Sequence, residues 1–109
     1  MTVNELAAAC GFDVMMMPEP ERTVQGGYAG DLLSWVMGKA EADNAFVTIM
    51  TNVNVVAVAA LADLSCVIFA ENVEVPKEVL TAAEQKGINL LRSRLPIYET
   101  CCLLGRQGI

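Results

Sequence analysis

The chain has 109 residues, of which 54% are hydrophobic and 18% are charged. This composition excludes a disordered chain, and the length fits a single domain over residues 1–109. The 13 acidic residues outnumber the 7 Lys and Arg residues, and the net charge of -6 argues against binding to the phosphate backbone of a nucleic acid. There is no histidine, so catalytic triads and metal sites that depend on histidine are excluded.

The sequence carries no signal for a membrane or for export. Its longest uninterrupted apolar run, Val55–Ala62, is far shorter than the roughly 20 residues of a membrane-spanning helix. A signal peptide begins with a positively charged region, and this chain has no Lys or Arg before Arg22. Four cysteines lie in apolar contexts without a CxxC spacing. Such thiols are typical of reduced cysteines and predict a cytoplasmic protein.

The chain is expected to begin with a short helix. Thr2 and Glu5 have the spacing of a capping box, which predicts a helix over Val3–Ala9 with Gly11 as its stop. A strand and three irregular segments are expected to follow, in the order Phe12–Met17 (strand), Pro18–Glu21 (polar turn), Arg22–Gln25 (extended) and Gly26–Gly30 (flexible Gly-rich turn).

The rest of the chain alternates between helical and strand patterns. Apolar residues spaced i, i+1, i+4 and i+5 predict an amphipathic helix over Asp31–Ala40. The helix predicted over Val53–Leu64 is apolar nearly all round, so one face could cover the sheet while another meets a partner. Pro76 is expected as the first helical residue and Gly87 as the stop of a fourth helix, Lys77–Lys86. The remaining elements are strands at Ala45–Met50, Cys66–Ala70 and Ile88–Leu91, and a last helix from Pro96 to Leu104 that Gly105 and Gly108 end.

Recurring strand–helix units predict an α/β fold, a compact three-layer domain with a mainly parallel sheet flanked by helices. Ligands of such sheets bind at the carboxyl ends of the strands. Two junctions there are candidates for a ligand site, and their residues are Gly26, Gly27, Tyr28, Gly30, Asp31, Thr51, Asn52 and Asn54.

Each junction has two interpretations. Glycine N–H groups at a helix N-terminus could bind an anion, or Asp31 could cap the helix and take the place of that anion. The polar side chains at Thr51–Asn54 could bind a small ligand or cap the next helix, and capping is favoured. Tyr28 is a candidate stacking side chain.

No catalytic, metal-binding or cofactor-binding constellation is recognised. The phosphate-binding pattern GxxxxGK[ST] is absent, so the chain is not expected to be a kinase on its own. Glu19 and Glu21, beside two prolines, are interpreted as a solvated turn rather than a carboxylate pair. Cys101 and Cys102 lack the four-ligand spacing of a cluster site.

The ordered motifs resemble the DRTGG-type domain family. Gly27–Leu33 is similar to the "AGDL" opening of these domains, and Thr51–Ala59 is similar to their strand-to-helix passage. Cys66–Phe69 and Gly87–Leu91 continue in register, but Glu71–Pro76 lacks the name-giving Gly-Asp-Arg motif. The resemblance implies the fold of the N-terminal domain of HPr kinase/phosphorylase, in a stand-alone form without the kinase domain. It also implies a regulatory, dimerising or ligand-sensing role. If the family's ligand site applies to this chain, the positions that match it best are Gly30, Asp31, Thr51 and Asn54.

We therefore expect a non-catalytic regulatory or interaction domain that works as a homodimer. The alternative is a sensor that binds a nucleotide or another small anion at the Gly-rich turn. An enzyme ranks third, because no nucleophile has a visible base.

Overall fold

Five strands form one sheet in the order β1-β5-β4-β3-β2. In this computed structural model, which describes all 109 residues, β2 to β5 are parallel and β1 pairs antiparallel with β5. The strands are β1 Asp13–Met16, β2 Gly27–Ala29, β3 Ala45–Thr48, β4 Cys66–Phe69 and β5 Asn89–Arg92. The helices are α1 Val3–Cys10, α2 Leu33–Lys39, α3 Val53–Leu61, α4 Lys77–Lys86 and α5 Ile97–Arg106.

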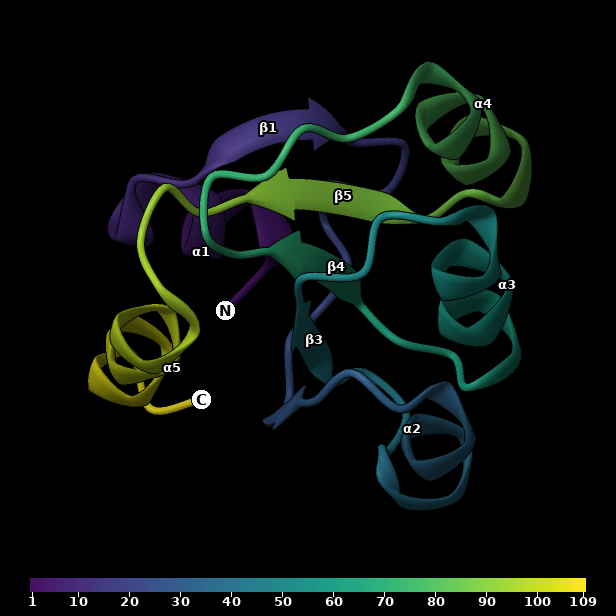
Figure 1. Cartoon of the computed structure of the whole chain (residues 1–109). Helices are drawn as coiled ribbons and strands as arrows, with labels where there is room; N and C mark the ends of the chain where they lie inside the picture. Colours follow the sequence, from purple (N-terminus) through teal and green to yellow (C-terminus); the bar gives the residue numbers. More distant parts are fainter.

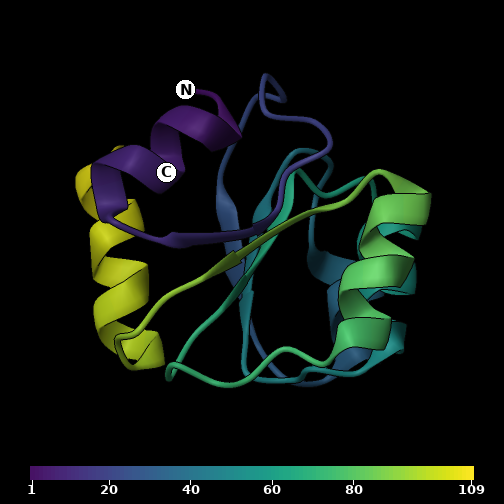
Figure 2. The same cartoon turned by 90° about the horizontal axis from the view of Figure 1, so that it is seen from above.

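The helices form a layer on each face of the sheet (Figures 1 and 2). Figure 2 places α1 and α5 on one side of the strands and α2, α3 and α4 on the other. Each face has its own core, because alternate residues of a strand point to opposite sides. In β3, Ala45 and Val47 belong to the core under α1 and α5, whereas Phe46 belongs to the core under the other three helices. The predicted three-layer α/β fold is confirmed.

The connections β2-α2-β3, β3-α3-β4 and β4-α4-β5 all run over the same face and add neighbouring strands in one direction. Doubly wound folds form their ligand crevice at the point where successive parallel connections change direction. This sheet has no such point. The carboxyl ends of β2 to β5 meet at one edge, the carboxyl edge. The opposite edge, where these strands begin, is the amino edge.

Several helix ends follow from local sequence signals. Thr2 and Glu5 form the predicted capping box, with bonds of 2.8 and 3.1 Å between side chains and backbone N–H groups. Gly11 ends α1 with a φ of 69°, and Gly87 ends α4 with a φ of 70°. These left-handed conformations are the ones that glycine adopts without strain.

The Gly-rich turn is the main correction to the predicted elements. Gly27–Ala29 is strand β2, because its backbone pairs in parallel with β3, a partner that local sequence does not reveal. Helix α2 consequently begins only at Leu33, and Leu32 rather than Asp31 is its N-cap residue.

Other helix ends also differ from the prediction. Helix α1 runs one residue further, to Cys10, and Pro96 is the N-cap of α5 rather than its first residue. Helix α3 stops at Leu61 instead of Leu64, since Asp63 adopts a left-handed φ of 57°. Pro76 is the N-cap of α4 rather than its first residue, and Gly105 lies inside α5. None of the five helices has the length and apolar character needed to cross a bilayer.

Candidate functional site

The two loops predicted to hold a ligand are tied together at the carboxyl edge. The Asp31 carboxylate accepts hydrogen bonds from the Thr48 hydroxyl at 2.7 Å and from the Ile49 N–H at 3.1 Å. The Thr48 hydroxyl also accepts a bond from the Met50 N–H at 3.2 Å. Asp31 therefore does not cap α2, and its carboxylate is held by the end of β3 and the loop that follows it.

The second junction begins helix α3. The Asn52 side chain accepts a hydrogen bond from the Asn54 N–H at 2.9 Å, so the capping interpretation is confirmed for Asn52. Thr51 is half-buried and Asn54 is exposed. Their side chains make no hydrogen bond within the chain and remain free to meet a ligand.

Three of the predicted ligand residues lie apart from this edge. Gly26 is at the amino edge, before β2, and its φ of 76° explains why glycine stands there. Gly27 and Tyr28 belong to β2 and border a small apolar cavity of about 170 Å³ under α5. The other residues of this cavity are Ala29, Val47, Cys101, Leu104 and Ile109.

A second carboxylate accepts a hydrogen bond from the first residue of helix α5. The Ile97 N–H donates to the Glu71 carboxylate at 3.0 Å, and Glu71 itself has a left-handed φ of 63°. This loop follows β4, where the name-giving motif of DRTGG-type domains was not found in the sequence. Because Asp31 and Glu71 both take N–H groups that could bind an anion, the carboxyl edge is a poor site for phosphate alone.

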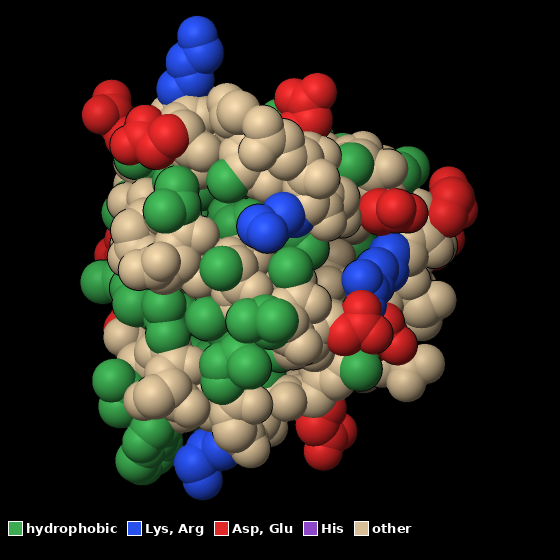
Figure 3. Space-filling view, turned by 90° about the vertical axis from the view of Figure 1, so that its right-hand side faces the viewer, with side chains coloured by type: hydrophobic (Ala, Val, Ile, Leu, Met, Phe, Trp, Pro, Cys, Tyr) green, Lys and Arg blue, Asp and Glu red, His purple; other side chains and the backbone are tan.

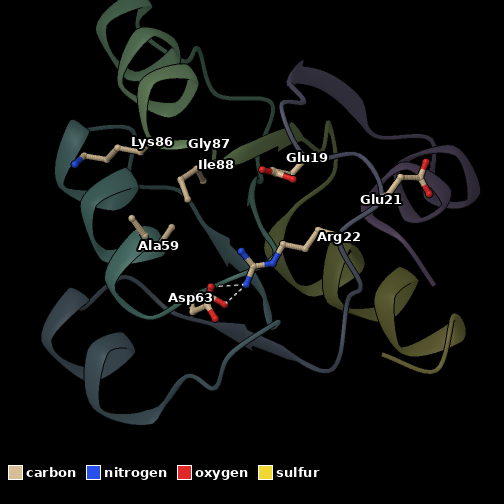
Figure 4. A pocket seen from close by; sticks show the side chains of 9 residues that line it. Glu19, Glu21, Arg22, Ala59, Asp63, Lys86, Gly87 and Ile88 are labelled. Carbon is tan, nitrogen blue, oxygen red and sulfur yellow. Dashed lines mark hydrogen bonds and ion pairs between the residues drawn. The ribbon is translucent and has the colours of Figure 1, made fainter.

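The structure has a larger cleft, about 500 Å³, at the amino edge (Figure 4). The Arg22 guanidinium crosses it and donates to the Asp63 carboxylate and carbonyl, both at 2.7 Å, and to the Asp43 carboxylate at 3.1 Å. The cleft is lined by Glu19, Glu21, Arg22, Ala59, Ala60, Asp63, Lys86, Gly87 and Ile88.

Sequence reasoning missed this arrangement around Arg22. Burial lowers the pKa of Arg22, but its bonds to Asp63 and Asp43 outweigh that effect and raise the pKa. Both aspartates have left-handed backbone conformations, with a φ of 66° at Asp43 and 57° at Asp63. The available signal was the Ala-Asp pair that precedes both β3 and β4 in the sequence. Nothing local indicated that Arg22 would lie between them.

Glu19 lines the same cleft and is held firmly in place. The buried Asn89 side chain accepts from the Glu19 N–H at 2.9 Å and donates to its carbonyl at 2.8 Å. Glu19 and Glu21 are exposed beside a turn at Pro20, as predicted for a solvated turn, and the two bonds to Asn89 anchor the Glu19 backbone. Its carboxylate makes no ion pair within the chain.

The cysteines are not set up as nucleophiles. Burial raises the pKa of the Cys66 thiol to about 12, and it also raises the pKa of Cys10 and Cys101. A thiol becomes a nucleophile or a metal ligand as the thiolate, which burial disfavours. No group of three or more Cys, Asp or Glu side chains is placed to hold a metal ion.

The outer face of α2 and α3 is unusually apolar (Figure 3). Trp35 on α2 is 58% exposed, and Val53 and Leu61 on α3 are 44% and 75% exposed. Figure 3 shows apolar side chains gathered over the middle and lower part of this side, with acidic side chains toward its rim. We refer to Trp35, Val53, Ala57 and Leu61 as the α2–α3 face. The inner side of α3, which packs on the sheet, consists of Val55, Val56 and Ala59.

Comparison with known proteins gives one informative likeness. No protein-family model matches the chain, and no curated protein matches it significantly in sequence. A solved structure of the CBS and DRTGG domains in the regulatory region of Clostridium perfringens pyrophosphatase, complexed with its activator diadenosine tetraphosphate, superposes with a TM-score of 0.71. The match has 10% sequence identity and covers 94% of this chain, which spans only 45% of that one. The chain therefore shares its fold with part of that CBS and DRTGG structure, as the DRTGG-type resemblance implied.

Proposed function

We propose that the chain is a non-catalytic regulatory or interaction domain that forms a homodimer through the α2–α3 face. The observation that carries this proposal is the exposure of Leu61 on the uncharged helix α3 and of Trp35 on α2, where Lys39 lies 5.1 Å from the Trp35 ring. Large apolar side chains gathered on one surface typically mark a contact with another molecule. A regulatory role also fits the structural likeness to a regulatory region that responds to an activator.

The sequence of α3 supports self-association on this face. Val53, Ala57 and Leu61 follow one another at four-residue intervals, which puts them on one side of a helix. Helix α3 contains no charged residue, so two copies can approach across it without placing like charges together, despite the net charge of -6. A two-fold axis would pair the same patch on both copies, as in most homodimers.

The chemistry of the side chains supports a role without catalysis. The cysteines with raised pKa values are poor nucleophiles at neutral pH, and histidine is absent. The two carboxyl groups whose pKa departs from its ordinary value, Glu5 and Asp13, are both lowered. Neither is suited to act as a general acid near pH 7.

Sedimentation of matched variants tests the dimer. Leu61→Asp places a charge on the α2–α3 face, and Tyr98→Asp places the same charge on α5, at a side chain with nearly equal exposure, 75% against 76%. We expect a dimer in the wild type at high micromolar concentration, at least tenfold weaker association for Leu61→Asp, and little change for Tyr98→Asp. A monomeric wild type, or an equal loss in both variants, would contradict the proposal.

A second candidate function is nucleotide sensing at the carboxyl edge. It is favoured by the contact between Asp31 and Ile49, which brings the two predicted junctions together, and by the free side chains of Thr51 and Asn54. The Clostridium perfringens region crystallised with a nucleotide activator, diadenosine tetraphosphate. This candidate ranks second because the carboxylates at this edge repel phosphate groups.

Thermal unfolding tests the second candidate. Binding to the folded state raises the unfolding midpoint, so diadenosine tetraphosphate and ATP at millimolar concentration should stabilise the wild type. Asn54→Ala should reduce this shift, and the same substitution at the exposed Asn4 on α1 should leave it unchanged. An unchanged midpoint in the wild type would reject nucleotide binding.

A further inference from the structure

The amino-edge cleft has the volume and the apolar lining of a site for a small molecule. Its volume of about 500 Å³ falls within the range of roughly 300–1,000 Å³ usual for ligand pockets. The buried side chains of Ala59 and Ile88 supply apolar lining, and Ala60 adds to it from the same helix as Ala59. An apolar lining next to charged groups suits a ligand with a hydrocarbon body and a polar end.

The charged groups around the cleft have a negative excess. Glu19 and Asp63 contribute carboxylates, whereas Arg22 already donates to two aspartates and Glu21 points away. Lys86 is the other cation, and Figure 4 shows its side chain leading away from Arg22 and Glu19. An anionic ligand would therefore meet carboxylates with little free positive charge to offset them.

The helices add to this polarity. Helices α3 and α4 both end at the amino edge, near Ala60 and Gly87, which line the cleft. The C-terminal end of a helix carries a partial negative charge that favours cations nearby. Two such ends beside the same carboxylates make the cleft attractive to a positive group.

Glu19 is the carboxylate best placed to bind a positively charged group in the cleft. Its backbone is fixed by the two hydrogen bonds to Asn89 and lies between Pro18 and Pro20. Figure 4 shows its side chain pointing toward Gly87 and Ile88, whereas Glu21 points away. A Cβ at position 87 would lie 3.9 Å from the Glu19 carboxylate, so this carboxylate and Gly87 are neighbours in the cleft.

We propose that the amino-edge cleft binds a small organic cation, with a primary ammonium group on the Glu19 carboxylate and a hydrocarbon body over Ala59 and Ile88. A metal ion does not fit, because hard cations need several oxygen ligands around one point and no three acidic side chains converge here. This site is on a different edge from Asp31, Thr51 and Asn54 and does not depend on the dimer.

Nuclear magnetic resonance titration of the full chain tests the site, with 1,5-diaminopentane as the probe. We expect saturable shifts confined to amides around Glu19, Asp63 and Gly87. Glu19→Gln keeps the shape but removes the charge, and it should weaken binding at least tenfold. Glu74→Gln, which removes an exposed carboxylate from the loop after β4, should bind the probe as the wild type does.

Three results would overturn the site. One is the absence of saturable shifts with millimolar probe. Another is an equal loss of binding in Glu19→Gln and Glu74→Gln, which would mean diffuse attraction to an acidic protein. A third is stronger binding of inorganic phosphate than of the diamine at the same amides. Because sedimentation of Leu61→Asp reports only on the dimer, failure of one proposal is distinguishable from failure of the other.

Discussion

The Asp31 carboxylate accepts a hydrogen bond of 2.7 Å from the Thr48 hydroxyl, although the two residues lie 17 positions apart. Thr48 is fully buried at the end of β3, and Asp31 lies between β2 and α2. The bond therefore fixes the loop after the edge strand to the interior of the sheet. Asp31 has a structural role that is independent of any ligand.

Replacing Asp31 with alanine is expected to lower the free energy of unfolding by about 1–3 kcal/mol, because the buried Thr48 hydroxyl loses its charged partner. Urea denaturation measures this change. Asp31→Asn keeps an acceptor oxygen and should lose less. An alanine variant as stable as the wild type would show that water replaces the carboxylate without cost.

The two adjacent glycines at the start of β2 should respond differently to substitution. Gly26 has a φ of 76°, and a Cβ there would lie 3.0 Å from the Asn44 side chain. Gly26→Ala is expected to cost about 1–2 kcal/mol through left-handed strain and crowding. Gly27→Ala meets only ordinary contacts of 3.5 Å or more and should be nearly neutral. Equal stability of both variants in urea denaturation would contradict this reading.

Asp13 should make the free energy of unfolding depend on pH in the acidic range. Hydrogen bonds from Arg94 and then Arg92 lower the pKa of Asp13, so its contribution to stability is present above the unfolded-state pKa, roughly 3.9, and is lost as the pH falls through the lower folded-state value. Asp13→Asn should be less stable than the wild type at pH 7, and the two should converge near pH 2 to 3. Urea midpoints measured across this range report the difference. A constant gap between the two proteins would rule out Asp13 as its source.

Cys66 should react with thiol reagents only when the protein opens. Its side chain is fully buried, and burial raises its pKa to about 12. Labelling with iodoacetamide at pH 8, followed by peptide mass analysis, should modify Cys66 at the rate of unfolding and much faster in urea. Rapid modification of Cys66 in the native protein would mean that β4 opens locally.

Features that depend on neighbouring residues could be predicted from the sequence. The capping box at Thr2 and Glu5 and the stop at Gly87 need only a few adjacent residues, and the structure contains both. The buried strand β4 was also predictable, because an unbroken apolar run is typical of a strand covered on both faces. Strand β3 was predictable from a mainly apolar segment between polar residues.

Features that depend on distant partners could not be predicted. Gly27–Ala29 has the composition of a turn and becomes a strand only through pairing with β3. Arg22 meets Asp43 and Asp63 across the amino edge, at separations of 21 and 41 residues. Asp31 fits the capping rule locally, but the hydroxyl of Thr48 competes successfully for it. In each case a long-range contact outweighs a local preference.

The position of β1 has a consequence for how the chain is made on the ribosome. β1 lies near the start of the sequence, yet its only neighbour in the sheet is β5, and Asp13 meets Arg92 at a separation of 79 residues. During translation β3, β4 and their connecting helices can assemble as they emerge, since each pairs with its successor. β1 leaves the exit tunnel before its partner β5 is made, so a pause in synthesis before residue 89 would leave β1 without a partner and open to chaperones.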